Sequence, residues 1–193
     1  MTKPSTTIIY VPGLGDVYDR GRAFALKSWS RRHLDIVFVP MKWRSTSESY
    51  ADKMRKVEVA IERCKSDRIV LVGESAGGAI VTAAGFRFKH KVDKTITIFG
   101  KNAKAHSVSP YLYRRNLAFK DAMMQSDYSI EEMNDTQAKK YLVIYSPFDP
   151  TIRKIDTYIP GAKMRKISTP GHLLSIALVL TVFQSIVIRE ASR

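Results

Sequence analysis

The most constraining feature of the sequence is a regular alternation between short apolar, β-branched runs and segments with helical periodicity. Several runs are nearly continuous in apolar residues, which is typical of parallel strands covered on both faces. The expected strands are residues 6–11, 35–39, 68–72, 94–99 and 141–145, with a less regular run at 163–167. This pattern predicts an α/β fold, a three-layer sandwich with a mostly parallel sheet of about six strands and helices on both faces.

The sequence indicates some of the helices between these strands more clearly than others. The clearest spans about 48–65, a second follows Ser75, and a third covers about 172–189, whereas a helix at about 22–33 is weaker. In the clearest helix, apolar side chains recur at three- and four-residue spacing: Tyr50, Met54, Val57, Ile61 and Cys64. This spacing gives the helix one apolar face for packing against the sheet.

Two serines have the spacing of N-terminal capping boxes. Ser45 is followed three residues later by Glu48, and Ser129 is followed likewise by Glu132. Such pairs satisfy free N–H groups at the start of a helix. The sequence therefore predicts helix starts at both places.

The long interval 101–140 interrupts the alternation of strands and helices. Its aromatic and methionine residues allow a small helical lid over a pocket, within about 104–137. The alternative is an ordinary crossover helix whose apolar face packs on the sheet. Both interpretations stay open at this point.

The chain has 193 residues, enough for one well-buried core and short for two, so we expect a single domain over 1–193. The only cysteine, Cys64, leaves no intrachain disulfide framework and fits a reducing compartment. Since it lies on the apolar face of a predicted helix, we expect a buried structural thiol. A cysteine-based zinc site needs several thiolates, and we predict neither a metal nor an organic cofactor.

The ends of the chain bear on its location. Residues 1–13 lack the long apolar stretch of a signal peptide, so we expect a cytoplasmic protein. The segment 173–188 is the one membrane candidate, but it is shorter than the roughly 20 residues that a spanning helix needs. It also contains polar residues, so we expect a buried core helix.

The formal charge is +14, from 32 Lys and Arg against 18 Asp and Glu. Such an excess favours an anionic partner: nucleic acid, a membrane surface or an acidic substrate. The basic residues are spread along the chain without a nucleic-acid-binding motif, so we predict no specific nucleic-acid partner. Peripheral contact with an anionic membrane and a merely solvated basic surface both stay open, and the oligomeric state is not indicated.

Three glycine-bearing turns follow predicted strands, and two of them can be compared with known motifs. The segment GLGDVYDRG fails as a dinucleotide-binding fingerprint, because Tyr18 stands where the third glycine is needed, and it lacks the ending of a P-loop. The segment GESAG at 73–77 matches G-x-S-x-G, in which a strained strand-to-helix turn exposes the serine hydroxyl. Small neighbours are needed because side chains at the flanking positions collide in so tight a turn. Ser75 is therefore a candidate nucleophile.

A serine nucleophile needs a base, and the base needs an orienting carboxylate. Asp149 follows the strand at 141–145, and His172 follows the last predicted strand. Parallel strands end at the same edge of the sheet, so both side chains are expected near Ser75. Asp156 is the fallback acid.

The other histidines fit the role of base less well. His33 and His90 precede strands and are expected at the opposite end of the sheet from Ser75. His106 follows the strand that ends at residue 99, so a contact with the substrate is conceivable. Only His172 follows both the candidate nucleophile and the candidate acid.

Acyl transfer also needs donors for the developing oxyanion. We expect one from the backbone N–H of Ala76, directly after the nucleophile, and one from Leu14 in the loop after the first strand. Gly13 and Gly15 would shape this loop, although a tight turn without a catalytic role is the alternative. Glu74, inside the elbow, completes the candidates for this region.

Taken together, these motifs resemble a small α/β-hydrolase over nearly the whole chain. PGLGD resembles the oxyanion loop, GESAG the nucleophile elbow, SPFDPT the acid loop and TPGH the histidine loop. Pro12 departs from the family pattern, in which many members carry histidine. The resemblance implies a serine hydrolase with a small-molecule acyl substrate, acting on an ester, a thioester or an amide. An acyltransferase with the same residues, and a non-catalytic binding protein for an acidic partner, are the alternatives.

Overall fold

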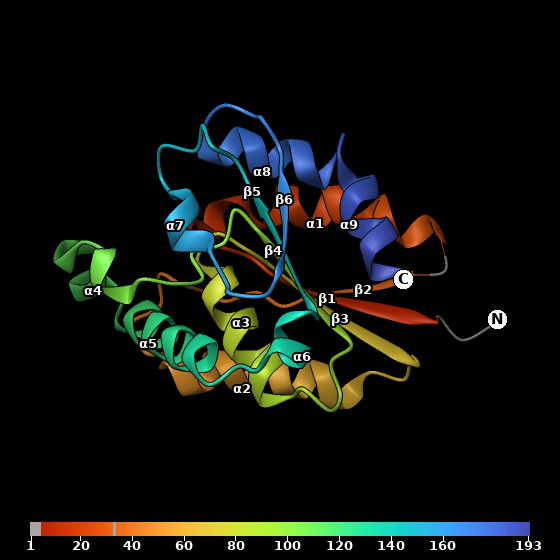
Figure 1. The fold of residues 1–193 in the computed structure, drawn as a ribbon, viewed down its shortest axis with the longest axis horizontal. Helices are drawn as coiled ribbons and strands as arrows, with labels where there is room; N and C mark the ends of the chain where they lie inside the picture. Colours follow the sequence, from red (N-terminus) through yellow and green to blue (C-terminus); the bar gives the residue numbers. More distant parts are fainter. Residues whose placement is uncertain (1–4, 33) are drawn as a thin grey trace.

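The computed structural model describes residues 5–32 and 34–193, and within them it forms one six-stranded sheet. All neighbouring strands are parallel, in the order β2-β1-β3-β4-β5-β6 (Figure 1). The predicted α/β fold is thus confirmed, with a fully parallel sheet. The strands are β1 Thr6–Val11, β2 Leu34–Phe38, β3 Arg68–Glu74, β4 Lys94–Ile98, β5 Tyr141–Tyr145 and β6 Lys163–Lys166.

Helices cover both faces of the sheet (Figure 1). One face carries α1 (Asp19–Lys27), α8 (His172–Leu180) and α9 (Gln184–Ala191). The other carries α2 (Tyr50–Arg63), α3 (Gly77–Arg87) and α5 (Leu117–Glu131). The shorter helical elements are η1 Asp16–Tyr18, η2 Trp29–Arg32, η3 Ala105–Ser107, α4 Pro110–Arg115, α6 Asp135–Ala138 and α7 Lys154–Thr157.

The continuous apolar runs follow from this two-sided cover. In β1, Ile8 and Tyr10 belong to the core beneath α1 and α8, whereas Ile9 and Val11 belong to the core beneath α2 and α3. Successive strand residues point to opposite faces, so both sets of residues must be apolar. Burial of apolar area on both faces is the main stabilising contribution to such a sheet.

The capping boxes predicted at Ser45 and Ser129 are wrong. The helix α2 starts at Tyr50, with Ser49 as the capping residue: Asp52 N–H donates to Ser49 Oγ (3.2 Å), and Ser49 N–H donates to the Asp52 carboxylate (2.8 Å). Glu48 is not available for a box because its carboxylate accepts hydrogen bonds from lysines of α2.

Ser129 lies inside α5 rather than at a helix start. Its hydroxyl donates to the Gln125 carbonyl oxygen at 2.7 Å, the back-bonding that serine commonly makes within helices. Glu132 is the C-terminal capping residue of the same helix. The spacing alone therefore could not separate a helix start from the end of a long helix.

The interval 101–140 contains α4, α5 and α6. The central helix α5 packs against α3 and buries Phe119, Ala122 and Met123 in the core, as a crossover helix does. Val108 and Leu112, which precede it, line a pocket at the edge of the sheet. The lid stays a prediction.

The apolar C-terminal segment forms two helices and not the expected single one. The helices α8 and α9 are bent by 57° relative to one another, and each buries one face in the core. Within residues 5–32 and 34–193, no single helix has the length and composition of a membrane span. The bent pair passes on those two criteria together.

The helices expected at about 22–33 and 48–65 are present, but their ends differ from the expected ones by a few residues. The weak helix expected at 22–33 is α1, which runs from Asp19 to Lys27, and His33 lies outside the described residues. The buried position expected for Cys64 is wrong: it is the C-terminal capping residue of α2 and is half-buried, because the helix ends just before it.

Candidate active site

Ser75 occupies the turn between β3 and α3 with φ of 49°, in the left-handed region that non-glycine residues rarely adopt. The flanking glycines make this turn feasible. A Cβ atom at Gly77 would collide with the Val11 carbonyl oxygen, and one at Gly73 would lie 2.5 Å from the Gly77 carbonyl oxygen. The strained turn thus exists because its neighbours lack side chains, as the G-x-S-x-G motif requires.

The structure brings Ser75, His172 and Asp149 into one hydrogen-bonded chain. His172 is the first residue of α8, and its Nε2 lies 2.9 Å from Ser75 Oγ. Its Nδ1 lies 2.6 Å from Asp149 Oδ2. Since an ionised carboxylate only accepts, Nδ1 carries the proton and Nε2 is left to accept the Ser75 hydroxyl proton.

Asp149 is held as a carboxylate. It is buried, and its Oδ1 accepts from the backbone N–H groups of Thr151 (2.8 Å) and Ile152 (3.0 Å). Burial alone would raise the pKa of Asp149, but the hydrogen bonds from His172 and the two backbone amides lower it below its usual value. The acid loop therefore presents a negative charge to the imidazole.

The loop after β1 lies directly against the elbow. A Cβ atom at Gly13 would stand 2.6 Å from Ser75 Cβ, and Gly15 has φ of 98°. Leu14 and Ala76 line the same pocket as Ser75. Among the described residues, neither the Leu14 N–H nor the Ala76 N–H has an acceptor, so both are free to donate to a ligand.

Glu74, a candidate for substrate contact in the sequence, is fully buried behind the elbow and does not line the pocket. Its carboxylate accepts from the Gly13 N–H at 3.2 Å and from the Tyr10 hydroxyl. It also lies 2.5 Å from the Arg22 guanidinium. The structure thus makes Glu74 a link between the elbow and the loop at Gly13.

Arg22 is a residue of this region that the sequence analysis missed. Its guanidinium donates to the Gly15 carbonyl oxygen (2.9 Å) and to Asp19 (2.9 Å), while it pairs with Glu74. Burial lowers the pKa of Arg22, but the surrounding acids outweigh it and raise the pKa above its usual value. The available signal was a basic residue inside a predicted helix, which is too common to single it out.

Beside Ser75 lies a pocket of about 330 Å³. Its apolar wall consists of Leu14, Val108, Leu112, Phe119, Pro150 and Ile152. Its polar end combines Lys101, Arg153 and Asp156 with nearby hydroxyls. A cleft of this kind, mainly apolar with a few converging polar groups, is typical of a small-molecule site.

Asp156, the fallback acid, is used at this polar end and does not contact His172. It pairs with Lys101 Nζ at 2.9 Å and with Arg153 Nε at 3.0 Å. Burial opposes ionisation, but the donors around the carboxylate outweigh it and lower the pKa of Asp156 to about 2. Two cations thus share one carboxylate.

The other histidines stay away from Ser75. His106 is part of η3 and borders a different pocket, so the conceivable substrate contact is not seen at the pocket beside Ser75. His90 lies in the turn between α3 and β4, at the far end of the sheet, as expected.

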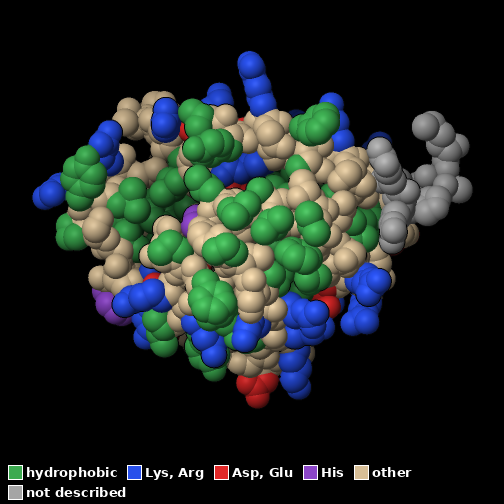
Figure 2. Space-filling view, turned by 90° about the horizontal axis from the view of Figure 1, so that it is seen from above, with side chains coloured by type: hydrophobic (Ala, Val, Ile, Leu, Met, Phe, Trp, Pro, Cys, Tyr) green, Lys and Arg blue, Asp and Glu red, His purple; other side chains and the backbone are tan. Residues whose placement is uncertain are grey.

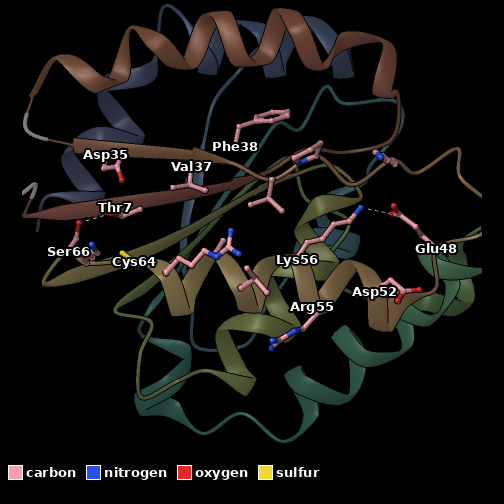
Figure 3. A pocket seen from close by; sticks show the side chains of 17 residues that line it. Thr7, Asp35, Val37, Phe38, Glu48, Asp52, Arg55, Lys56, Cys64 and Ser66 are labelled. Carbon is pink, nitrogen blue, oxygen red and sulfur yellow. Dashed lines mark hydrogen bonds and ion pairs between the residues drawn. The ribbon is translucent and has the colours of Figure 1, made fainter.

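A larger pocket, of about 920 Å³, lies between the edge strand β2 and the helix α2. Figure 3 shows side chains of both elements pointing into it, with Lys56 paired to Glu48 and Thr7 to Ser66. It shares no lining residue with the pocket beside Ser75. The larger pocket is therefore not the one that contains the candidate nucleophile.

No protein-family model and no curated protein sequence matches the chain. Solved structures do match over nearly its whole length. A structure of the metagenome-derived lipolytic enzymes LipS and LipT has a TM-score of 0.71 and 11% identity, covering 98% of this chain and 93% of that one. The monoacylglycerol lipase of Paleococcus ferrophilus gives 0.66 and 10% identity, covering 99% and 96%.

The carboxylesterase CesB of Bacillus subtilis gives a TM-score of 0.60 with 14% identity, covering 96% of this chain and 84% of that one. At such identities the likeness concerns the fold. The chain has the α/β-hydrolase fold, and the three structural neighbours named here are esterases and lipases.

Proposed function

We propose that the chain is a serine hydrolase that cleaves a carboxylic ester through an acyl-enzyme intermediate. The observation that carries the proposal is the hydrogen-bonded chain from Ser75 through His172 to Asp149, next to a pocket with two free N–H donors. Fold alone does not define an activity, and this arrangement supplies the chemistry that the fold leaves open.

In the first half of the reaction, His172 Nε2 takes the Ser75 hydroxyl proton while Ser75 Oγ bonds to the ester carbonyl carbon. The carbonyl oxygen gains negative charge and accepts from the Leu14 and Ala76 N–H groups. Asp149 stabilises the imidazolium. The intermediate collapses when His172 returns the proton to the leaving alcohol, so that Ser75 carries the acyl group.

In the second half, a water molecule gives its proton to His172 Nε2 and attacks the acyl carbon. The C–O bond to Ser75 breaks, and the proton on His172 returns to Ser75 Oγ. The products are an alcohol and a carboxylic acid. Besides the substrate and water, these steps use only the Ser75, His172 and Asp149 side chains and the two backbone N–H groups.

The pocket favours a short acyl group, because its volume of about 330 Å³ is near the lower end for small-molecule sites. Thioesters and amides need the same groups, and an ester is the least demanding substrate among the three. In an acyltransferase an alcohol or amine would replace water in the second half. No feature of the site selects that alternative.

Labelling with a fluorophosphonate tests the proposal, since this reagent forms a stable bond with an activated serine. We expect the wild-type chain to be labelled and the Ser75→Ala variant not to be, while both unfold at similar temperatures. Absence of Ser75-dependent labelling in folded protein would refute the hydrolase and leave the non-catalytic binding protein. Product analysis with added alcohol separates hydrolysis from transfer.

A further inference from the structure

Large apolar side chains are exposed beside three loops of the candidate active site, those at Gly13, Asp149 and His172. Val17 and Tyr18 follow the loop at Gly13, and Phe148, 63% exposed, precedes Asp149. Two leucines, at 173 and 174, directly follow His172 and are more than half exposed. Exposed apolar residues are common singly, but their gathering around one reactive centre needs an explanation.

The exposed apolar surface continues along the outer faces of α1 and α8, which pack against each other. Phe24 on α1 is 75% exposed, and Val182, just after α8, is 66% exposed. Figure 2 looks onto this side of the molecule and shows hydrophobic side chains gathered in the middle of the face. We call this surface the entrance patch, consisting of Val17, Tyr18, Phe24, Phe148, Leu173, Leu174 and Val182.

The charges around the entrance patch are mainly positive. Arg20 and Lys27 are exposed on α1, and Figure 2 shows many more Lys and Arg than Asp and Glu side chains on this face. The acid next to Tyr18, Asp19, is already paired with Arg22. The local balance therefore follows the net charge of +14 of the whole chain.

Exposed apolar side chains surrounded by positive charge favour one kind of binding partner. A second copy of the chain would bring a second charge of +14 against the first, and like charges repel across an interface. An anionic lipid surface fits both features, because it takes up apolar side chains at the level of the acyl chains and attracts Lys and Arg at the headgroups. Each basic residue near such a surface adds attraction that salt weakens, whereas inserted apolar side chains hold at high salt.

We propose that the entrance patch docks the chain on an anionic lipid surface, with the Ser75 pocket facing the lipid. The inference deepens the proposed function: it assigns the ester substrate to the lipid phase. Phe148 directly precedes Asp149 and Leu173 directly follows His172, so docking of the patch brings the pocket and the lipid esters together.

Binding is measured with Ser75→Ala protein by sedimentation with vesicles of phosphatidylcholine, alone or mixed with phosphatidylglycerol, at low and high salt. The test variant adds Phe24→Ser and Leu174→Ser. The matched control adds Met124→Ser and Tyr128→Ser, two comparably exposed side chains of α5 on the opposite face of the sheet (Figure 1). Thermal unfolding checks that both variants fold.

We expect binding to the anionic vesicles with a part that survives high salt. The entrance-patch variant should lose about tenfold in partition, since two apolar anchors are removed, and the control should keep its binding. Equal partition of the two variants, complete release by salt, or equal binding to vesicles without anionic lipid would each overturn the inference. A wild-type dimer that the patch variant abolishes would also overturn it, in favour of self-association.

The docking inference and the proposed hydrolase activity can be refuted independently of each other. Vesicle binding is measured on protein without Ser75, so it does not depend on hydrolysis. In an otherwise wild-type background, the entrance-patch variant should hydrolyse a soluble short-chain ester at the unaltered rate but lose activity on the same ester class dispersed in anionic vesicles. Unchanged activity on the vesicle-borne ester contradicts the docking inference alone, whereas absence of fluorophosphonate labelling contradicts the hydrolase.

Discussion

The Arg22 guanidinium lies 2.5 Å from the Glu74 carboxylate and, on its other side, donates to the Gly15 carbonyl oxygen at 2.9 Å. Glu74 directly precedes Ser75 and accepts from the Gly13 N–H. The pair therefore connects the elbow with the loop that carries the Leu14 N–H. Both side chains are buried, so the charges are weakly screened by solvent.

Arg22→Met should lower kcat about tenfold to a hundredfold with little change in KM, because the Leu14 donor would no longer be held toward the developing oxyanion. Steady-state kinetics on a soluble ester measures this. The substitution also leaves the Glu74 charge unpaired in the interior, which destabilises the fold.

The control for Arg22→Met is the double variant Arg22→Met/Glu74→Gln. It removes the unpaired charge, so the free energy of unfolding should recover while kcat stays low. If kcat recovers together with stability, the pair has only a structural role and the positioning assignment fails.

Asp149→Asn should lower kcat by about three to four orders of magnitude, as expected when the imidazole is held in the wrong tautomer. The amide keeps the size of the side chain, so fluorophosphonate labelling should become slower without loss of the folded state. Asp156→Asn is the matched variant, since this second buried carboxylate does not contact His172. Equal losses in the two variants would contradict the assignment of the acid.

Stability at low pH should depend on Asp156. Its pKa is lowered to about 2 in the folded chain, so the folded state binds fewer protons than the unfolded state below about pH 5. The stabilisation is present at neutral pH and is lost as the pH falls through about 4 toward 2. Asp156→Asn should flatten urea-measured stability over this window, and an unchanged slope would contradict the ion cluster.

The positions of the sheet strands and of Ser75, His172 and Asp149 could be predicted, because strand order places later loops at the same edge. The capping box at Ser45 could not, since Glu48 pairs with Lys53 and Lys56 instead. Those contacts depend on how α2 meets the preceding loop.

The sequence did not indicate the role of Arg22 either. A basic residue in a helix is usually solvated, and only the folded chain shows that Arg22 reaches the Glu74 carboxylate across the loop. Exposure is also a property of the fold: the apolar residues of 173–188 were expected in the core, but some of them form part of the entrance patch. Local patterns thus predicted the elements, and packing decided the partners of individual side chains.

Gly77→Ala should destabilise the chain and abolish its activity. The added Cβ would meet the Val11 carbonyl oxygen and lie 2.8 Å from that of Pro12, and backbone atoms at the end of β1 cannot move aside without shifting the oxyanion loop. We expect a loss of about 3 kcal/mol in the free energy of unfolding, measured by urea denaturation.

Gly21→Ala is the matched control, because no atom of the described chain outside its own helical turn lies within 4 Å of a Cβ at this position. Gly21 is exposed on α1, and alanine in a helix is favoured over glycine by about 1 kcal/mol, so this variant should gain stability. The same substitution should therefore lower the free energy of unfolding at Gly77 and raise it at Gly21. This contrast tests whether the elbow packs tightly against the end of β1. A mild effect of Gly77→Ala, close to that of Gly21→Ala, would show that the turn has room for a side chain and that the strained geometry of Ser75 does not depend on its neighbours.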